Sequence, residues 1–129
     1  MDEFKEWLDA YGAAGQNGDA QAAIDLFSDN VEYYETPFDD PMVGRDAIQR
    51  YWNEGAGQSQ QEVRFLHEAI AVVANMGLAK WQATFVRIPS GIHVELDGFL
   101  TAEFDAVGKC SVFREWWHRR ESESALVST

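Results

Sequence analysis

Four long runs of strand-forming residues follow one another through the second half of the sequence, and they limit the possible folds more than any other feature. They cover residues 63–74, 78–88, 92–104 and 110–119. The links between them are only a few residues long, and each contains a glycine. Links of that length join neighbouring strands in antiparallel hairpins. The pattern therefore predicts a meander of long antiparallel strands.

The first half of the chain has helical periodicity instead. Apolar residues recur at three- and four-residue spacing over 2–14, which places them on one face of a helix. Asp19 is a suitable N-cap for a short second helix that includes Phe27, and Gly44 precedes a third helix. A short aromatic strand over 31–35 lies between these two helices. Helices followed by a meander predict an α+β fold, with the helices packed on one face of a strongly curved antiparallel sheet.

Length and charge narrow the classes of partner. At 129 residues the chain is expected to form one domain over 1–120, followed by a polar tail over 121–129. A net charge of −12 repels phosphate, so we expect neither nucleic acid nor an anionic membrane as a partner. Aromatic residues make up 13% of the sequence, enough for a dense core or for an aromatic cavity.

Three weaker features point to the cytoplasm. Cys110 is the only cysteine, so an internal disulfide is impossible and a reducing compartment is expected. No apolar run approaches the roughly 20 residues that a membrane span needs. The segment MDEFKEWL at the start is acidic and amphipathic, unlike a secretion signal.

The last strand has large apolar side chains on both faces. Phe113, Glu115 and Trp117 alternate with Arg114 and Trp116. Because helices can cover only one face of the sheet, the outer face is expected to be covered by a second copy of the chain. A two-fold homodimer is the commonest closed arrangement.

Glu115 is unusual because it shares a face with two aromatic residues. A carboxylate that is buried there must be paired or protonated. We expect a structural ion pair with an arginine from another element, such as Arg45 or Arg64. The alternative is a group that contacts the ligand in a pocket.

Several short motifs, in order along the chain, carry a family resemblance. They are Tyr11 with Gly18-Asp19, the segment 26–31 (LFSDNV), the segment 44–48 (GRDAI) and the turn Gly108-Lys109. In this the sequence resembles the nuclear transport factor 2-like superfamily, also called cystatin-like, which includes SnoaL-like cyclases and ketosteroid isomerases. The resemblance covers nearly the whole chain. It implies a cone with an internal pocket for a small hydrophobic or aromatic molecule.

The resemblance to ketosteroid isomerase also implies catalytic positions. Tyr11 and Asp97 match the tyrosine and the protonated aspartic acid of its oxyanion hole. The base position departs from that pattern, because Thr36 stands there and Glu35 lies one residue earlier. Glu35 is a candidate base, with a structural carboxylate that accepts hydrogen bonds from the following loop as the alternative. In a regular strand Asp97 would face solvent, so its role requires a bulge between Phe99 and Ala102, which we expect.

His67 is a further candidate base, with a structural histidine as the alternative. The residues expected to line the pocket are Tyr33, Trp52, Phe65, Trp81, Phe85, Phe99, Phe113, Glu115 and Trp117. No spacing of His, Cys and carboxylate residues matches a metal site, and we expect neither a metal nor a cofactor. The sequence thus predicts a small-molecule-binding protein. Its reaction could be isomerisation, cyclisation, dehydration or hydrolysis, or the same fold could serve as a non-catalytic binding or interaction module.

Overall fold

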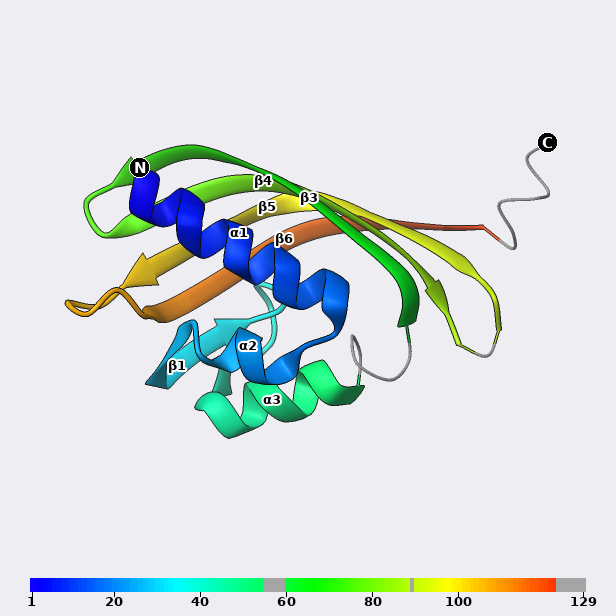
Figure 1. The fold of residues 1–129 in the computed structure, drawn as a ribbon, viewed down its shortest axis with the longest axis horizontal. Coiled ribbons are helices and arrows are strands. Elements are labelled where there is room, and N and C mark those ends of the chain that lie inside the picture. The colour runs from blue at the N-terminus through cyan, green and yellow to red at the C-terminus, as the bar shows by residue number, and fades with distance from the viewer. Residues whose placement is uncertain (55–59, 89, 123–129) are drawn as a thin grey trace.

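A curved sheet with helices on one side makes up the fold (Figure 1). The computed structural model describes residues 1–54, 60–88 and 90–122. The elements are α1 (Asp2–Asn17), α2 (Ala20–Ile24), β1 (Phe27–Tyr34), β2 (Met42–Val43), α3 (Arg45–Glu54), β3 (Gln60–Val73), β4 (Met76–Arg87), β5 (His93–Phe104) and β6 (Cys110–Ser122). The predicted α+β class is confirmed. The short strand β2 was not predicted.

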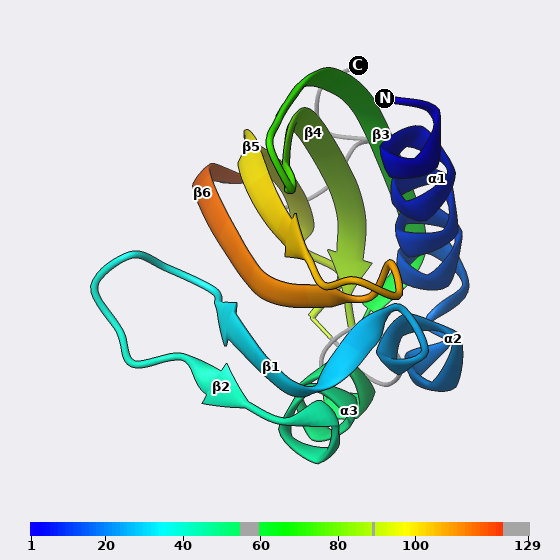
Figure 2. The same ribbon diagram turned by 90° about the vertical axis from the view of Figure 1, so that its left-hand side faces the viewer.

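The sheet has six strands in the order β2-β1-β6-β5-β4-β3, and it bends around α1 (Figure 2). The three predicted hairpins, from β3 through β6, are antiparallel as expected. β1, however, pairs with β6 in parallel, so the sheet is mixed and the purely antiparallel prediction is wrong. Short hairpin links fix the relative direction only of strands that follow one another, and β1 and β6 are not such a pair.

Local signals set the limits of the first two helices. α1 ends at Gly18, which has the left-handed φ of 63° that glycine adopts without strain. The Asp19 carboxylate accepts a hydrogen bond from Ala22 N at 3.0 Å and caps α2. α2 is shorter than predicted, because Phe27 already begins β1 and is buried there. Its spacing from the alanines of α2 fits a helix equally well, which explains the error.

Aromatic rings from α1, β1 and β6 fill the core. The Trp7 ring stacks on Tyr11 with centroids 5.3 Å apart, and the Trp7 indole nitrogen donates to Leu26 O at 3.0 Å. Phe113 of β6 is fully buried and stacks on Tyr33 of β1 at 4.7 Å. This packing fixes the positions of Tyr11 and Tyr33 relative to β6.

The predicted bulge in β5 is absent. β5 pairs without a register shift from His93 to Glu103 on both sides, and the one irregularity lies between Glu103 and Phe104. β5 and β6 come very close instead at Gly98, where an added Cβ would lie 1.9 Å from Trp116 O. Only glycine allows that approach, so the strands draw together without a change in side-chain alternation.

Two segments of the chain lie partly or wholly outside the described residues. β6 continues to Ser122, so the predicted tail begins inside a strand, and its residues 123–129 lie outside the described part. Residues 55–59, between α3 and β3, also lie outside it. Among the described residues, no helix is long and apolar enough to cross a membrane.

Candidate binding and acid–base site

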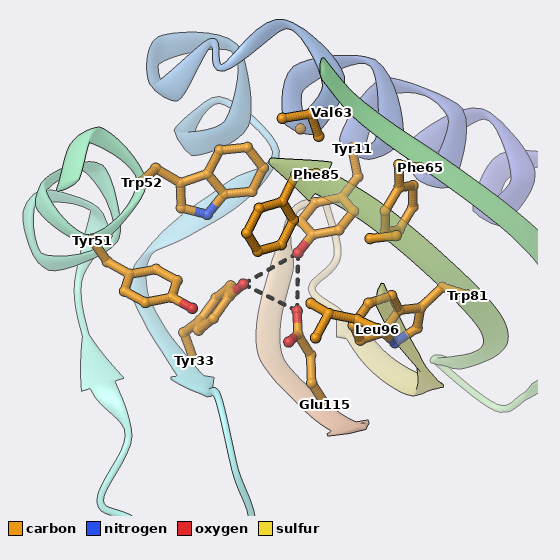
Figure 3. A pocket seen from close by; sticks show the side chains of 12 residues that line it. Tyr11, Tyr33, Tyr51, Trp52, Val63, Phe65, Trp81, Phe85, Leu96 and Glu115 are labelled. Carbon is orange, nitrogen blue, oxygen red and sulfur yellow. Dashed lines mark hydrogen bonds between the residues drawn. The ribbon is translucent and has the colours of Figure 1, made fainter. Parts of the chain in front are cut away.

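A cavity of about 180 Å³ lies between the helices and the concave face of the sheet (Figure 3). Its wall is mostly aromatic and contains one carboxyl group. The lining residues are Tyr11, Gly15, Tyr33, Tyr51, Trp52, Val63, Phe65, Trp81, Ala83, Phe85, Leu96 and Glu115. Mostly aromatic and aliphatic residues from α1, β1, α3, β3, β4 and β5 thus surround a single acid from β6.

Two tyrosines hold the Glu115 carboxyl group. Its Oε1 accepts a hydrogen bond from the Tyr11 hydroxyl at 3.1 Å and from the Tyr33 hydroxyl at 3.2 Å. The two hydroxyl oxygens lie 3.1 Å from each other. The three residues come from α1, β1 and β6, which are brought together by the aromatic core described above. We call these three residues the Glu115 triad.

The environment of Glu115 makes it a proton carrier near neutral pH. Burial raises the pKa of its carboxyl group to about 7, the hydrogen bonds from Tyr11 and Tyr33 lower it, and the charge of Glu35 raises it. The residue is only partly accessible, and it lines the cavity. A carboxyl group with such a pKa is present in both protonation states at pH 7, as general acid–base catalysis requires.

The tyrosines of the cavity remain protonated under the same conditions. Burial raises the pKa of both Tyr11 and Tyr33 well above the usual range, and the charge of Glu115 raises it further. Burial, Glu115 and Glu35 also raise the pKa of Tyr51. The Tyr11 and Tyr33 hydroxyl groups therefore donate hydrogen bonds to the Glu115 carboxyl group and do not act as bases.

Glu35 lies beside this cavity and does not line it. Its backbone oxygen accepts a hydrogen bond from the Trp117 indole nitrogen at 3.1 Å. Its side chain interacts with the Tyr51 hydroxyl and with Glu115 through charge. Glu35 and Trp117 line a neighbouring hollow, to which Glu115 also contributes. Glu35 is thus placed to influence Glu115 and not to meet a molecule in the main cavity.

Most residues predicted to contact the ligand are in the cavity wall. They are Tyr33, Trp52, Phe65, Trp81, Phe85 and Glu115, together with Tyr11 from the predicted catalytic set. Two others lie elsewhere on the inner side of the sheet. Phe113 is buried beneath the Glu115 triad, and Trp117 lines the neighbouring hollow. They support the site and are not part of the cavity wall.

Asp97 and Phe99 face away from the cavity, contrary to prediction. Asp97 is exposed on the outer face, where its Oδ2 accepts a hydrogen bond from Gln82 Nε2 at 2.8 Å. Phe99 is on the same face and is 44% exposed. Regular alternation along β5 places both there, because the bulge that would have turned them inward is absent. Asp97 therefore cannot complete an oxyanion hole with Tyr11.

His67 is held against α1 and does not line the cavity. Its Nε2 lies 3.5 Å from Asp9 Oδ1, and a Cβ added at Gly12 would lie 3.0 Å from the imidazole ring. This matches the structural alternative that the sequence left open. The catalytic prediction for His67 has no support from its position.

The expected ion pair of Glu115 is also wrong. Arg45 donates to Ile24 O and pairs with Asp25 and Asp29, on another side of the molecule. Arg64 is exposed on β3. The actual partners of Glu115 are Tyr11 and Tyr33. The contact of Tyr33 with Glu115 was not predicted, because it depends on the parallel pairing of β1 with β6. Tyr51 was missed as a lining residue, although it lies in the helical stripe next to Trp52.

The described residues contain no group of three or more His, Cys, Asp or Glu side chains that could hold a metal ion. Glu115 has phenol groups as its hydrogen-bond partners, and a phenol with a raised pKa is a poor metal ligand. The chemistry available in the cavity is hydrogen bonding and proton transfer by one carboxyl group.

Several solved structures share this fold. The epoxide hydrolase/cyclase-like enzyme SalBIII, which has a role in pyran ring formation in the polyether salinomycin, matches with a TM-score of 0.77 at 21% identity, over 88% of this chain and 89% of that one. The Δ5-3-ketosteroid isomerase from Mycobacterium sp. matches with a TM-score of 0.79 at 15% identity, over 93% and 98%. A computationally designed 17-OHP binder matches with a TM-score of 0.77 at 15% identity, over 90% and 94%.

Comparison by sequence finds fewer matches than comparison by structure. No curated protein matches the chain. At the identities given above, the structural matches establish the fold alone. The model of the SnoaL-like domain, however, matches residues 4–113, which include most of α1, the sheet through Phe113 and all of the cavity wall except Glu115. With the predicted cone-shaped α+β architecture also present, the chain belongs to the SnoaL-like domain family.

Proposed function

We propose that the protein binds a small, uncharged, mainly apolar molecule in the cavity and transfers a proton to or from it through Glu115. The observation that carries this proposal is the Glu115 triad: one carboxyl group with two tyrosine donors, at 3.1 and 3.2 Å, in an aromatic cavity. A carboxyl group in apolar surroundings whose pKa is raised toward neutrality is a common form of catalytic acid or base.

The cavity wall supports an uncharged ligand. Among the described lining residues there is no Lys, Arg or His, so an anionic ligand would have no cationic partner. The volume of about 180 Å³ supports a small one. An apolar cavity of about 150 Å³ is known to bind benzene, and drug-sized ligands occupy about 300–1,000 Å³. A single ring with a few substituents fits this range.

Both protonation states of Glu115 are useful. When protonated, it can give its proton to a carbonyl or epoxide oxygen, which makes the neighbouring carbon more electrophilic. When ionised, it can take a proton from a carbon next to a carbonyl group or from water. Tyr11 and Tyr33 position the carboxyl group and, by their hydrogen bonds, keep its pKa from rising further. This assignment replaces the predicted pairing of Tyr11 with Asp97.

Similar structures guide the choice of reaction to test. One match is an epoxide hydrolase/cyclase-like enzyme and another is an isomerase. We therefore select two reactions: ring opening of styrene oxide, and exchange of the α-hydrogens of 4-methylcyclohexanone in D₂O. Each includes a proton transfer that a single carboxyl group can perform, to the epoxide oxygen as water adds in the first reaction and from the α-carbon, before a deuteron from solvent replaces the proton, in the second. Both can be followed by NMR without a coupled assay.

The variant Glu115→Gln keeps the size of the side chain and removes its acid–base function. We expect the wild-type protein to accelerate at least one of the two reactions. Glu115→Gln should reduce that acceleration by about 10²–10⁴-fold, the usual contribution of a general acid or base. Asp97→Asn, on the outer face, is the matched control and should leave the rate unchanged.

If neither reaction exceeds the buffer rate in the wild-type protein although both compounds bind, the catalytic proposal fails for these reaction classes. The alternative, a non-catalytic ligand-binding module, would then be preferred. Equal rates for the wild type and Glu115→Gln would also contradict the assigned role of Glu115. Binding is measured on the same samples by quenching of tryptophan fluorescence, because Trp52 and Trp81 line the cavity.

We also propose a homodimer formed through the outer face of the sheet. Large apolar side chains are exposed there at Leu66 (66%), Ile70 (44%), Phe99 (44%) and Trp116 (41%). Sedimentation should give a dimer at micromolar concentration, and Trp116→Glu should shift it toward monomer. A wild-type monomer at that concentration contradicts the proposal. A cytoplasmic location stays a prediction that rests on the sequence.

A further inference from the structure

Two indole N–H groups in the cavity wall have no hydrogen-bond partner. They belong to Trp52 and Trp81, which are 6% and 4% exposed. The indole nitrogens of two other tryptophans, Trp7 and Trp117, are both bonded to backbone oxygens. An indole N–H can only donate, and leaving a buried donor unpaired costs about 1–3 kcal/mol. Native proteins rarely retain such a cost without a reason.

The Trp52 ring is held so that its nitrogen faces the polar side of the cavity. Its Cη2 lies 3.8 Å from the position that a Cβ would take at Gly15, and its ring meets Tyr11 edge-on at 5.5 Å between centroids. Figure 3 shows the nitrogen edge of the Trp52 ring turned toward the hydroxyl groups of Tyr33 and Tyr51. The donor therefore faces the polar side of the cavity, which Glu115 also lines, and because the nitrogen itself is covered an acceptor reaches it when the surrounding side chains shift.

Trp81 differs in this respect. In Figure 3 its nitrogen lies on the side of the ring away from the tyrosine hydroxyls. Its ring stacks on Phe65 with centroids 5.8 Å apart and contributes an apolar surface to the wall. Of the two unpaired donors, Trp52 is the one that faces the Glu115 triad.

We propose that the ligand carries two hydrogen-bond acceptors on an apolar ring, one that meets Glu115 and a second that accepts a hydrogen bond from the Trp52 indole nitrogen. The ligand class is thus an uncharged ring compound with two separated oxygens, such as a diketone or an epoxy ketone. The inference rests on the proposed function, because it assumes that the ligand lies beside Glu115. It adds Trp52 as a residue that determines specificity.

The test uses two ring compounds with the same number of heavy atoms. Cyclohexane-1,4-dione has two acceptors, and in 4-methylcyclohexanone a methyl-bearing carbon replaces one carbonyl group. Their dissociation constants are measured for the wild type, Trp52→Phe and Trp81→Phe. The ratio of the two constants within each protein cancels the general effect of the lost ring volume.

We expect the ratio to favour the dione by about two- to tenfold more in the wild type than in Trp52→Phe, the effect of one neutral hydrogen bond. Trp81→Phe should keep the wild-type ratio. An equal ratio in the wild type and Trp52→Phe overturns the proposal. So does a loss in Trp81→Phe as large as that in Trp52→Phe, because the second acceptor would then not be specific to Trp52.

A second measurement follows the wild-type protein and uses Trp52→Phe only for assignment. The five tryptophans give five indole cross-peaks in a ¹H–¹⁵N spectrum, and the absence of one peak in Trp52→Phe assigns Trp52. Addition of the dione should move the Trp52 indole proton downfield, as a new hydrogen bond does, and 4-methylcyclohexanone should not. A downfield shift that is the same with both compounds contradicts the proposal.

These outcomes are separate from those that test Glu115. If both compounds bind, lose the same affinity in Trp52→Phe and do not change the chemical shift of the Trp52 indole proton, only the second acceptor is refuted. If binding or rate is insensitive to Glu115→Gln, the proposed function fails, whatever the result for Trp52.

Discussion

Two strand carboxylates, Glu115 and Asp97, lie on opposite faces of the same pair of strands. Glu115 of β6 points into an aromatic cavity and has two phenol donors. Asp97 of β5 points outward and has one amide donor from Gln82. Asp97 has the sequence context of a catalytic acid in a related enzyme, yet it is Glu115 that has the environment of one. The face of the strand and the residues opposite decide which carboxylate can carry a proton.

Truncation of a phenylalanine on the inner or on the outer face of the sheet should give the largest difference in stability. Phe113 is fully buried below the Glu115 triad, whereas Phe99 is 44% exposed on the outer face. Phe113→Ala should lower the free energy of unfolding by about 3–5 kcal/mol, and Phe99→Ala by less than about 1 kcal/mol in the monomer. Urea unfolding measures both, and similar losses would show that the outer face is packed as tightly as the core.

Glu115 should also make stability depend on pH. The pKa of Glu115 is about 7 in the folded protein and near 4.5 in the unfolded chain. Between pH 4.5 and 7, Glu115 is therefore mostly protonated in the folded protein and mostly ionised in the unfolded chain. The stability that Glu115 contributes is therefore fully present below about pH 4.5 and is lost as the pH rises through 7. The loss is at most about 3 kcal/mol, because its partial exposure to the cavity reduces it.

The corresponding measurement compares the free energy of unfolding of the wild type and Glu115→Gln at pH 5 and pH 8. The wild type should lose stability relative to the variant as the pH rises. Other titrating groups are common to both proteins, so their contributions cancel in the difference. A difference that is the same at both pH values would contradict a raised pKa at Glu115.

The tyrosine donors give a smaller and more specific effect. Tyr33→Phe removes one hydrogen bond that lowers the pKa of Glu115, so the pKa should rise by about one pH unit. The neighbouring Tyr34 is a matched control, since it faces the other way, with the Arg114 guanidinium 4.4 Å above its ring. Tyr34→Phe should leave the pKa of Glu115 unchanged. Equal pKa shifts in both variants would refute a direct contact as the cause.

The outer carboxylate should give the smallest effect. Asp97→Asn can keep an acceptor for Gln82, and the contact is exposed. Its free energy of unfolding should stay within about 0.5 kcal/mol of the wild type. A loss above about 2 kcal/mol would mean that Asp97 is buried in the protein as it exists in solution, for example in a dimer interface.

Most of the fold could be predicted from periodicity alone. The alternation in the meander and the short links between its strands indicated three antiparallel hairpins, and these are present. The parallel contact of β1 with β6 could not be predicted, because no short link determines it. The end of α2 was misplaced for a simpler reason: Phe27 fits both the helical spacing and the first inward position of β1.

The site was predictable as a set of residues but not as an arrangement. An aromatic wall followed from alternation in β4, which places Trp81 and Phe85 on one face. The partners of Glu115 did not follow, since Tyr11 is 104 positions away in the sequence and Tyr33 is 82 positions away. The error at Asp97 arose where a resemblance in sequence context was preferred to the regular alternation of a strand.

Glu115 is the carboxyl group of the cavity that we expect to change its protonation state near neutral pH. This expectation is tested most directly by following the side-chain ¹³C signals of glutamate through a pH titration, with Glu115→Gln to assign the resonance. The account predicts a midpoint near pH 7 for Glu115. A midpoint near 4.5, the value of an exposed glutamate, would contradict it.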